Sequence, residues 1–225
     1  MKHINVLVRA FCASAMAFCL FASPLLAALP EKHQEYMKNE SYKGAFEQFT
    51  AGMKEAKERF TPDEYANIEM GIYEVIAASI KEDMETGSSE ADAYETAYLM
   101  GYKQVGNELR WDWLRKNAED AQGFYRLKSD VFDGYMTLEK AEKKGIYAVN
   151  ISLVMKKTPY NSGDFYGPGK LSGKKMIVPN DDDKNAVTIL LDGESARVAT
   201  TQTFKKSGVL GANVTLDGKY LREKK

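Results

Sequence analysis

Two aspartates near the end of the chain share the same local sequence. Asp192 lies in "TILLDG" and Asp217 in "VTLDGK". A pair of carboxylates can act as general acid and base, and such pairs hydrolyse glycosidic bonds without a histidine. Asp-Gly is also the standard pair of tight hairpin turns, because glycine accepts a positive φ. Since each pair follows an apolar run rich in β-branched residues, we predict two turns of one small sheet.

Histidine and cysteine are almost absent from the chain after its first 28 residues. The sequence has two of each, and all but His33 lie within the first 28 residues, which we assign below to an export signal. One histidine at the start of the remaining chain, with no cysteine, argues against Ser-His-Asp and Cys-His catalysis and excludes a zinc site built from these ligands. We therefore expect no cofactor.

The segment "NDDDKN" at 180–185 has the densest group of hard oxygen ligands. Asp181, Asp183 and Asn185 fall at positions one, three and five of a calcium-binding loop, and Asp192 falls at position twelve. Ala186, however, stands where that loop needs glycine, and the residues after it are typical of a strand. We predict a solvated turn, with these three residues as the one weak metal candidate.

Aromatic residues in the helical region supply candidate contact surfaces. Tyr94, Tyr98 and Tyr102 are spaced four apart and share one helix face, which favours a core position, although phenol rings also line sugar and peptide grooves. Trp111 and Trp113 are two residues apart and point to nearly opposite faces of a helix. At least one indole is therefore expected to leave the helical core and pack at the domain junction or against a partner.

Lysines accompany aromatic residues in the last third of the chain. Lys174, Lys175 and Tyr220 belong to this set, and such a mixture can bind single-stranded nucleic acid. In an exported protein we expect instead an envelope protein, an acidic glycan or a lipid head group as the partner. The alternative is scattered charge that only keeps the protein soluble.

The first 28 residues have the composition of a secretory signal. Lys2 and Arg9 precede an uncharged stretch that reaches Leu29, with Pro24 near its end and alanines at 27 and 28 for cleavage. An uncleaved membrane anchor is the alternative, since such a stretch could span a bilayer. We predict cleavage, a periplasmic protein and no remaining membrane span.

Residues 29–145 have helical spacing of apolar side chains and an acidic balance, with 16 basic against 24 acidic residues. "TPDE" at 61–64 predicts a helix start with a capping box. A further helix is expected after "NAED", on the spacing of Phe124, Leu127, Val131, Tyr135 and Leu138, and it would end at Gly145. We predict an acidic bundle of four or five helices.

Residues 146–225 are basic, with 13 basic against 8 acidic residues, and their pattern changes to strands. We expect strands at 146–155, 174–179, 185–192, 196–204 and 213–221, and a loop at 156–173 that is rich in Gly and Pro. The fold class is thus α+β, with a helical bundle followed by a small antiparallel β domain.

The final segment carries a resemblance to small OB-fold domains of exported bacterial proteins. The residues concerned form a closing "G-x-x-V-T-x-x-G-x-Y" strand: Gly211, Val214, Thr215, Gly218 and Tyr220. The resemblance covers about a fifth of the chain and implies a barrel that binds ligands on one face. A generic antiparallel sheet or sandwich is the alternative.

These features together indicate a non-enzymatic exported protein, a binding or envelope-associated module. The alternatives are a carboxylate-based hydrolase acting on envelope glycan and a chaperone-like or structural periplasmic protein with an exposed apolar surface.

Overall fold

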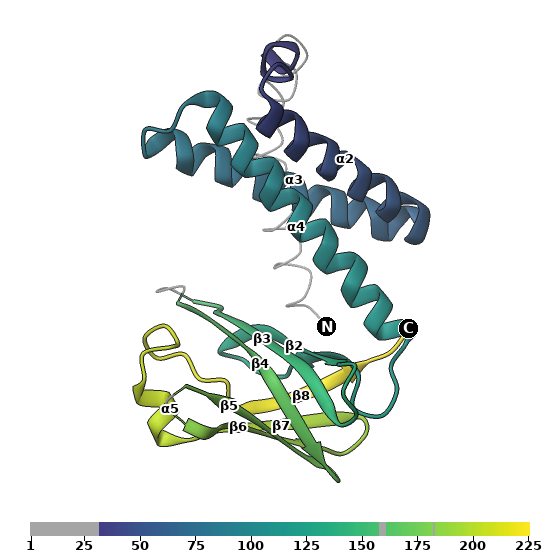
Figure 1. Cartoon of the computed structure of the whole chain (residues 1–225), viewed down its shortest axis with the longest axis vertical. Coiled ribbons are helices and arrows are strands. Elements are labelled where there is room, and N and C mark those ends of the chain that lie inside the picture. Colours follow the sequence, from purple (N-terminus) through teal and green to yellow (C-terminus); the bar gives the residue numbers. More distant parts are fainter. Residues whose placement is uncertain (1–31, 158–160, 182) are drawn as a thin grey trace, which may run out of the picture. The chain divides into compact units, whose positions relative to one another are not determined.

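The computed structural model describes residues 32–157, 161–181 and 183–225. They form two compact units, helices first and a β-barrel second, and the division falls after Leu109 (Figure 1). The α+β fold class and its closed antiparallel barrel are confirmed. The expected export signal lies outside the described residues.

The helical unit is built on α2 (Glu40–Arg59), α3 (Pro62–Glu85) and α4 (Glu90–Lys116), of which α4 continues into the second unit. Asn39 caps α2 by accepting bonds from the backbone N–H groups of Ser41 and Tyr42. The buried side chains recur at three- and four-residue spacing, so each helix turns one apolar face inward. The core includes Tyr42, Phe49, Met53, Ile72, Ile76, Ile80, Tyr94, Tyr98 and Val105.

The capping box predicted at the start of α3 is present. The hydroxyl of Thr61 accepts from the N–H of Glu64, while the Glu64 carboxylate accepts from the N–H of Thr61. We expect Thr61→Ala to lower the free energy of unfolding by about 1 kcal/mol, because the helix N-terminus loses its acceptor. Urea unfolding followed by circular dichroism measures this change.

Thr50→Ala is the matched control, since Thr50 is exposed and lies inside α2. Alanine has the higher helix propensity there, so this variant should be neutral or slightly stabilised. Equal losses in the two variants would show that the cap contributes nothing.

The second unit contains eight antiparallel strands that neighbour one another in chain order. They are β1 (Gly123–Leu127), β2 (Phe132–Lys140), β3 (Ile146–Met155), β4 (Ser162–Ser172), β5 (Lys175–Asn180), β6 (Asp183–Leu191), β7 (Ser195–Thr200) and β8 (Gly218–Glu223). The short helix α5 (Gln202–Lys206) lies between β7 and β8. Pairing of β8 with β1 closes the barrel.

Alternate residues of each strand point into the barrel. In β3, for example, Tyr147, Val149, Ile151 and Leu153 are all buried. Fully buried side chains from other strands meet them, among them Met136, Leu138, Met176, Val178, Val187, Ile189, Ala196 and Tyr220. The middle of the barrel is therefore a packed core.

The helix predicted at the end of the acidic region is wrong, because those residues form β1 and β2. Phe124 points outward from β1, yet it is fully buried, since the rings of Trp111 and Tyr135 pack against it. Both faces of these strands thus carry apolar residues, and this mixture imitates helical spacing. The change from helix to strand lies between Lys116 and Gly123, ahead of the expected boundary at Gly145.

The loop predicted at 156–173 is wrong for most of its length, because residues 162–172 form β4. Its inward positions include Gly163, Gly167 and Gly169. A Cβ on Gly169 would lie 2.5 Å from the Met176 sulfur and 2.8 Å from Val149. Glycine is used here because large neighbours from β3 and β5 fill the interior.

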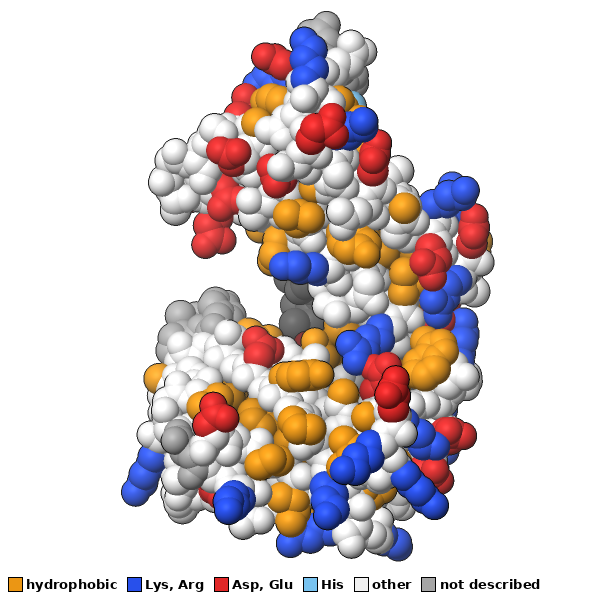
Figure 2. All heavy atoms as spheres, in the orientation of Figure 1, with side chains coloured by type: hydrophobic (Ala, Val, Ile, Leu, Met, Phe, Trp, Pro, Cys, Tyr) orange, Lys and Arg blue, Asp and Glu red, His pale blue; other side chains and the backbone are white. Residues whose placement is uncertain are grey.

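The two units differ in charge. Residues 32–109 have 8 basic and 16 acidic residues, a net of −8, whereas residues 110–225 have 21 and 15, a net of +6. Figure 2 shows many of the Lys and Arg side chains of the barrel gathered toward its lower edge in that view. Among the described helices, none is both long and apolar enough for a membrane span.

Candidate functional site

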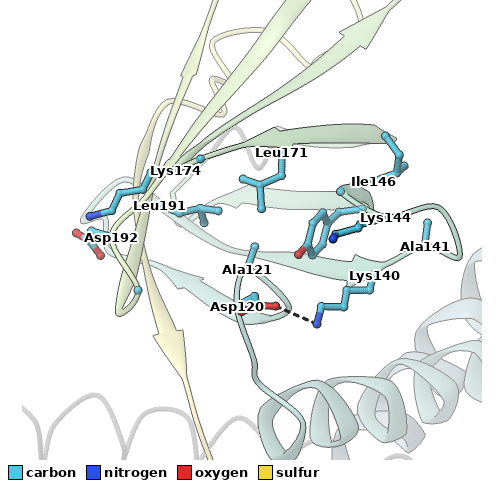
Figure 3. Close-up of a pocket in the computed structure, with 14 residues that line it drawn as sticks. Asp120, Ala121, Lys140, Ala141, Lys144, Ile146, Leu171, Lys174, Leu191 and Asp192 are labelled. Atoms are coloured by element: carbon cyan, nitrogen blue, oxygen red, sulfur yellow. Dashed lines mark ion pairs between the residues drawn. The ribbon is translucent and has the colours of Figure 1, made fainter.

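A pocket of about 670 Å³ opens at one end of the barrel (Figure 3). Strands that run up and down place alternate turns at the same end, and here the β2–β3, β4–β5 and β6–β7 turns meet the segment before β1. The lining residues are Asp120, Ala121, Lys140, Ala141, Lys144, Gly145, Ile146, Tyr147, Leu171, Gly173, Lys174, Leu191, Asp192 and Gly193.

The floor of the pocket is apolar. Tyr147, Leu171 and Leu191 occupy the last inward positions of their strands, directly above the packed core. Arg222 fixes two parts of the wall: its guanidinium donates to the carbonyl oxygen of Gln122, and to that of Gly193 at 3.2 Å. The barrel therefore holds the pocket between strand ends and short turns.

Lysines surround this apolar floor. Lys140 is engaged, since its ammonium lies 2.5 Å from Glu119 and 3.1 Å from Asp120, and the hydrogen bond with Glu119 raises its pKa. Lys144 and Lys174 have no ion-pair partner among the residues that the structure describes. Figure 3 shows Lys144 near Ile146 and Lys140, with Lys174 beside Asp192 at the opposite rim.

Tyr147 adds an uncharged donor. Its ring is buried, and within the described ranges its hydroxyl has no hydrogen-bond partner. Asp192, by contrast, is occupied: its carboxylate accepts from the Ser195 hydroxyl at 2.8 Å and from the Ser195 N–H at 2.7 Å, which lowers its pKa. The groups left for a ligand are two ammonium groups and one phenol.

The two Leu-Asp-Gly segments play different structural roles. Asp192 and Gly193, the latter at φ +92°, form the predicted turn between β6 and β7. The turn predicted at Asp217 is not a hairpin, because β8 begins at Gly218 and the preceding residues form no strand. Asp217 instead accepts from the Thr200 N–H at 2.7 Å and pairs with Lys205. Burial raises the pKa of Asp217, but these donors outweigh it and the net shift is downward.

The aromatic residues named from the sequence fall in different places. Tyr94 and Tyr98 are buried in the helical core, which leaves them almost no exposed surface for a partner, whereas Tyr102 is 41% exposed. Trp111 packs on Tyr135 with ring centroids 4.6 Å apart, and Trp113 is 40% exposed. Neither indole lies in the core of the helical unit.

The three barrel residues predicted as ligand contacts, Lys174, Lys175 and Tyr220, lie in different surroundings. Lys174 lines the pocket, and Lys175 is exposed beside it without lining it. Tyr220 is fully buried in the barrel, with its hydroxyl donating to the carbonyl oxygen of Leu216 at 3.0 Å. It has no surface through which a ligand could contact it.

The weak metal candidate is a hydrogen-bonded turn. Asp183 accepts from the Thr201 hydroxyl, and from the N–H of Asn185 at 2.8 Å, and these bonds lower its pKa. Asp181 is exposed. Within residues 32–157, 161–181 and 183–225, no group of three or more His, Cys, Asp or Glu side chains could hold a metal ion.

Lys144, Tyr147, Leu171 and Leu191 were missed as site residues. The segment "EKKG" at 142–145 was interpreted as the end of a helix, although it is the β2–β3 turn. Apolar residues at the inward positions near the strand ends could have identified the pocket. This inference requires β2 and β4 to be predicted as strands, and they were not. Comparison with known families, curated proteins and solved structures found no match to this chain.

Proposed function

We propose that this chain is an exported, non-enzymatic binding protein whose β-barrel holds a small ligand in its end pocket. The observation that carries the proposal is the combination of an apolar floor with two polar groups that have no partner among the described residues, the Lys144 ammonium and the Tyr147 hydroxyl. Binding pockets of about 300–1,000 Å³ are typically apolar, with a few polar groups that orient the ligand. The pocket falls within that range.

Export is supported by the composition of the first 28 residues, which is that of a secretory signal. The two carboxylates that sequence reasoning considered for catalysis already accept hydrogen bonds, Asp192 from Ser195 in its own turn and Asp217 from the more distant Thr200. The binding assignment therefore fits the site better than acid-base chemistry does.

Native purification from the periplasm of an exporting host tests the proposal. We expect a small molecule to co-purify with the protein and to be released on unfolding, where mass spectrometry identifies it. A bound ligand also raises the unfolding temperature above that of protein refolded without it, by mass action. Cytoplasmic retention of the chain contradicts export, and a ligand-free protein with equal unfolding temperatures before and after refolding contradicts binding.

A further inference from the structure

We propose that the end pocket binds a single-chain amphiphile with a short apolar chain and one anionic head group. This inference rests on the proposed function and adds the chemical class of the ligand. It follows from three features of the pocket: the sign of its unengaged charges, its apolar floor and the packed core below.

The head group is assigned from the donors. Lys144 and Tyr147 line the pocket without partners, so they can give an anionic oxygen one charged and one neutral hydrogen bond. Both acidic residues in the lining already have donors, Asp120 from Lys140 and Asp192 from Ser195. A cationic head group would find no free carboxylate in this pocket.

The short length of the apolar chain is assigned from the core. Leu171 and Leu191 provide a surface for methylene groups, but Met136, Leu138, Val149 and Met176 below them are completely buried. A chain cannot pass deeper without displacing this core. Affinity should therefore rise about fourfold for each added methylene group up to the floor and then stop rising.

Titration of the full chain with decanoate is the direct test, below the concentration at which micelles form. Calorimetry measures affinity, and the amide resonances of Gly145, Gly173 and Gly193 report the location, because all three residues line the pocket. We expect these resonances to shift with decanoate and with decyl phosphate. Decanol and decylamine should bind at least tenfold more weakly.

Two pairs of neighbouring residues give matched variants. Lys144 lines the pocket, whereas Lys143 is in the same turn, exposed and outside the lining. Lys144→Ala should weaken decanoate binding about tenfold, and Lys143→Ala less than twofold, although both remove one charge. In the same way Leu191→Ser should weaken binding severalfold, while Leu190→Ser on the outer face should not.

Equal effects of Lys143→Ala and Lys144→Ala would overturn the inference, as would equal affinity for decanol and decanoate. Affinity that rises from decanoate through hexadecanoate would overturn the length limit. If decanoate fails to bind but another molecule co-purifies and shifts the same glycines, the ligand class is wrong and the binding function stands. If no molecule co-purifies with the protein and none shifts these glycine resonances, both the ligand class and the binding function are wrong.

Discussion

Replacing Gly134 by alanine is expected to lower the free energy of unfolding by about 3 kcal/mol or more. Gly134 is buried in β2 and pairs with Leu153 in β3. A Cβ at this position would lie 2.5 Å from the Leu153 side chain and 2.6 Å from the carbonyl oxygen of Ser152. The oxygen belongs to the neighbouring strand, so relief of the clash requires β2 and β3 to separate.

Urea unfolding of the purified variants measures the effect, with Gly106→Ala as the control. Gly106 lies in α4, and a Cβ there would meet nothing within 4 Å. Alanine should stabilise this helix by about 0.5–1 kcal/mol. A Gly134→Ala protein with the stability of the parent would mean that the β2–β3 pairing is looser than described.

Replacing Asp112 by asparagine should cost about 2 kcal/mol. The Asp112 side chain has no exposed surface, and its carboxylate lies 2.8 Å from the Lys116 ammonium and 3.0 Å from that of Lys225. Loss of one partner leaves the others with an unbalanced charge, which is costly in buried surroundings. Because Lys116 and Lys225 are 44% and 35% exposed, we expect less than a fully buried pair would give.

The pH dependence of this effect has a definite sign. Burial alone would raise the pKa of Asp112, but hydrogen bonds from Lys116 and Lys225 outweigh it and bring the pKa below the ordinary value. A carboxyl with a lower pKa in the folded state stabilises above its unfolded pKa, about 3.9, and loses this contribution as the pH falls through the folded value.

The difference in unfolding free energy between the parent and Asp112→Asn should thus be largest near pH 7 and shrink below about pH 4. Denaturant melts at pH 7, 5 and 3 test this. Glu142→Gln, an exposed change outside these ion pairs, is the control and should show little difference at any pH. A gap that widens on acidification would contradict the assigned direction of the pKa shift.

The helices were predictable where one face is buried and the end signals are local. The helical spacing of apolar side chains and the capping box at Thr61 depend on neighbours in the chain, and both are present in α2 and α3. β3 was predicted with its bounds, because alternation between apolar and polar residues survives wherever one face meets solvent. The local sequence is sufficient to predict these elements.

β5, β6 and β7 overlap the strands predicted at 174–179, 185–192 and 196–204, whereas β1, β2 and β4 were missed because they depend on residues distant in the sequence. Phe124 is buried on the outer face because Trp111 and Tyr135 pack against it, and the inward positions of β4 hold glycines because Met176 and Val149 occupy the space. No local pattern contains this information. The pocket was missed for the same reason, since Lys144, Leu171 and Leu191 meet only when the strands close.

The pairing of β1 with β8 has a consequence for how the barrel is made. Residues Gln122 and Arg222, 100 positions apart, are bonded at the closure. Contacts between such distant residues form slowly, because the chain between them must lose conformational entropy before the contact stabilises the structure. Until then β1 and β8 are open edges, which can pair with other chains. Folding speed and resistance to aggregation should therefore depend on the pairing of β1 with β8, and substitutions that weaken it, at Phe124 or Leu221, should lower the refolding rate and yield as well as the equilibrium stability.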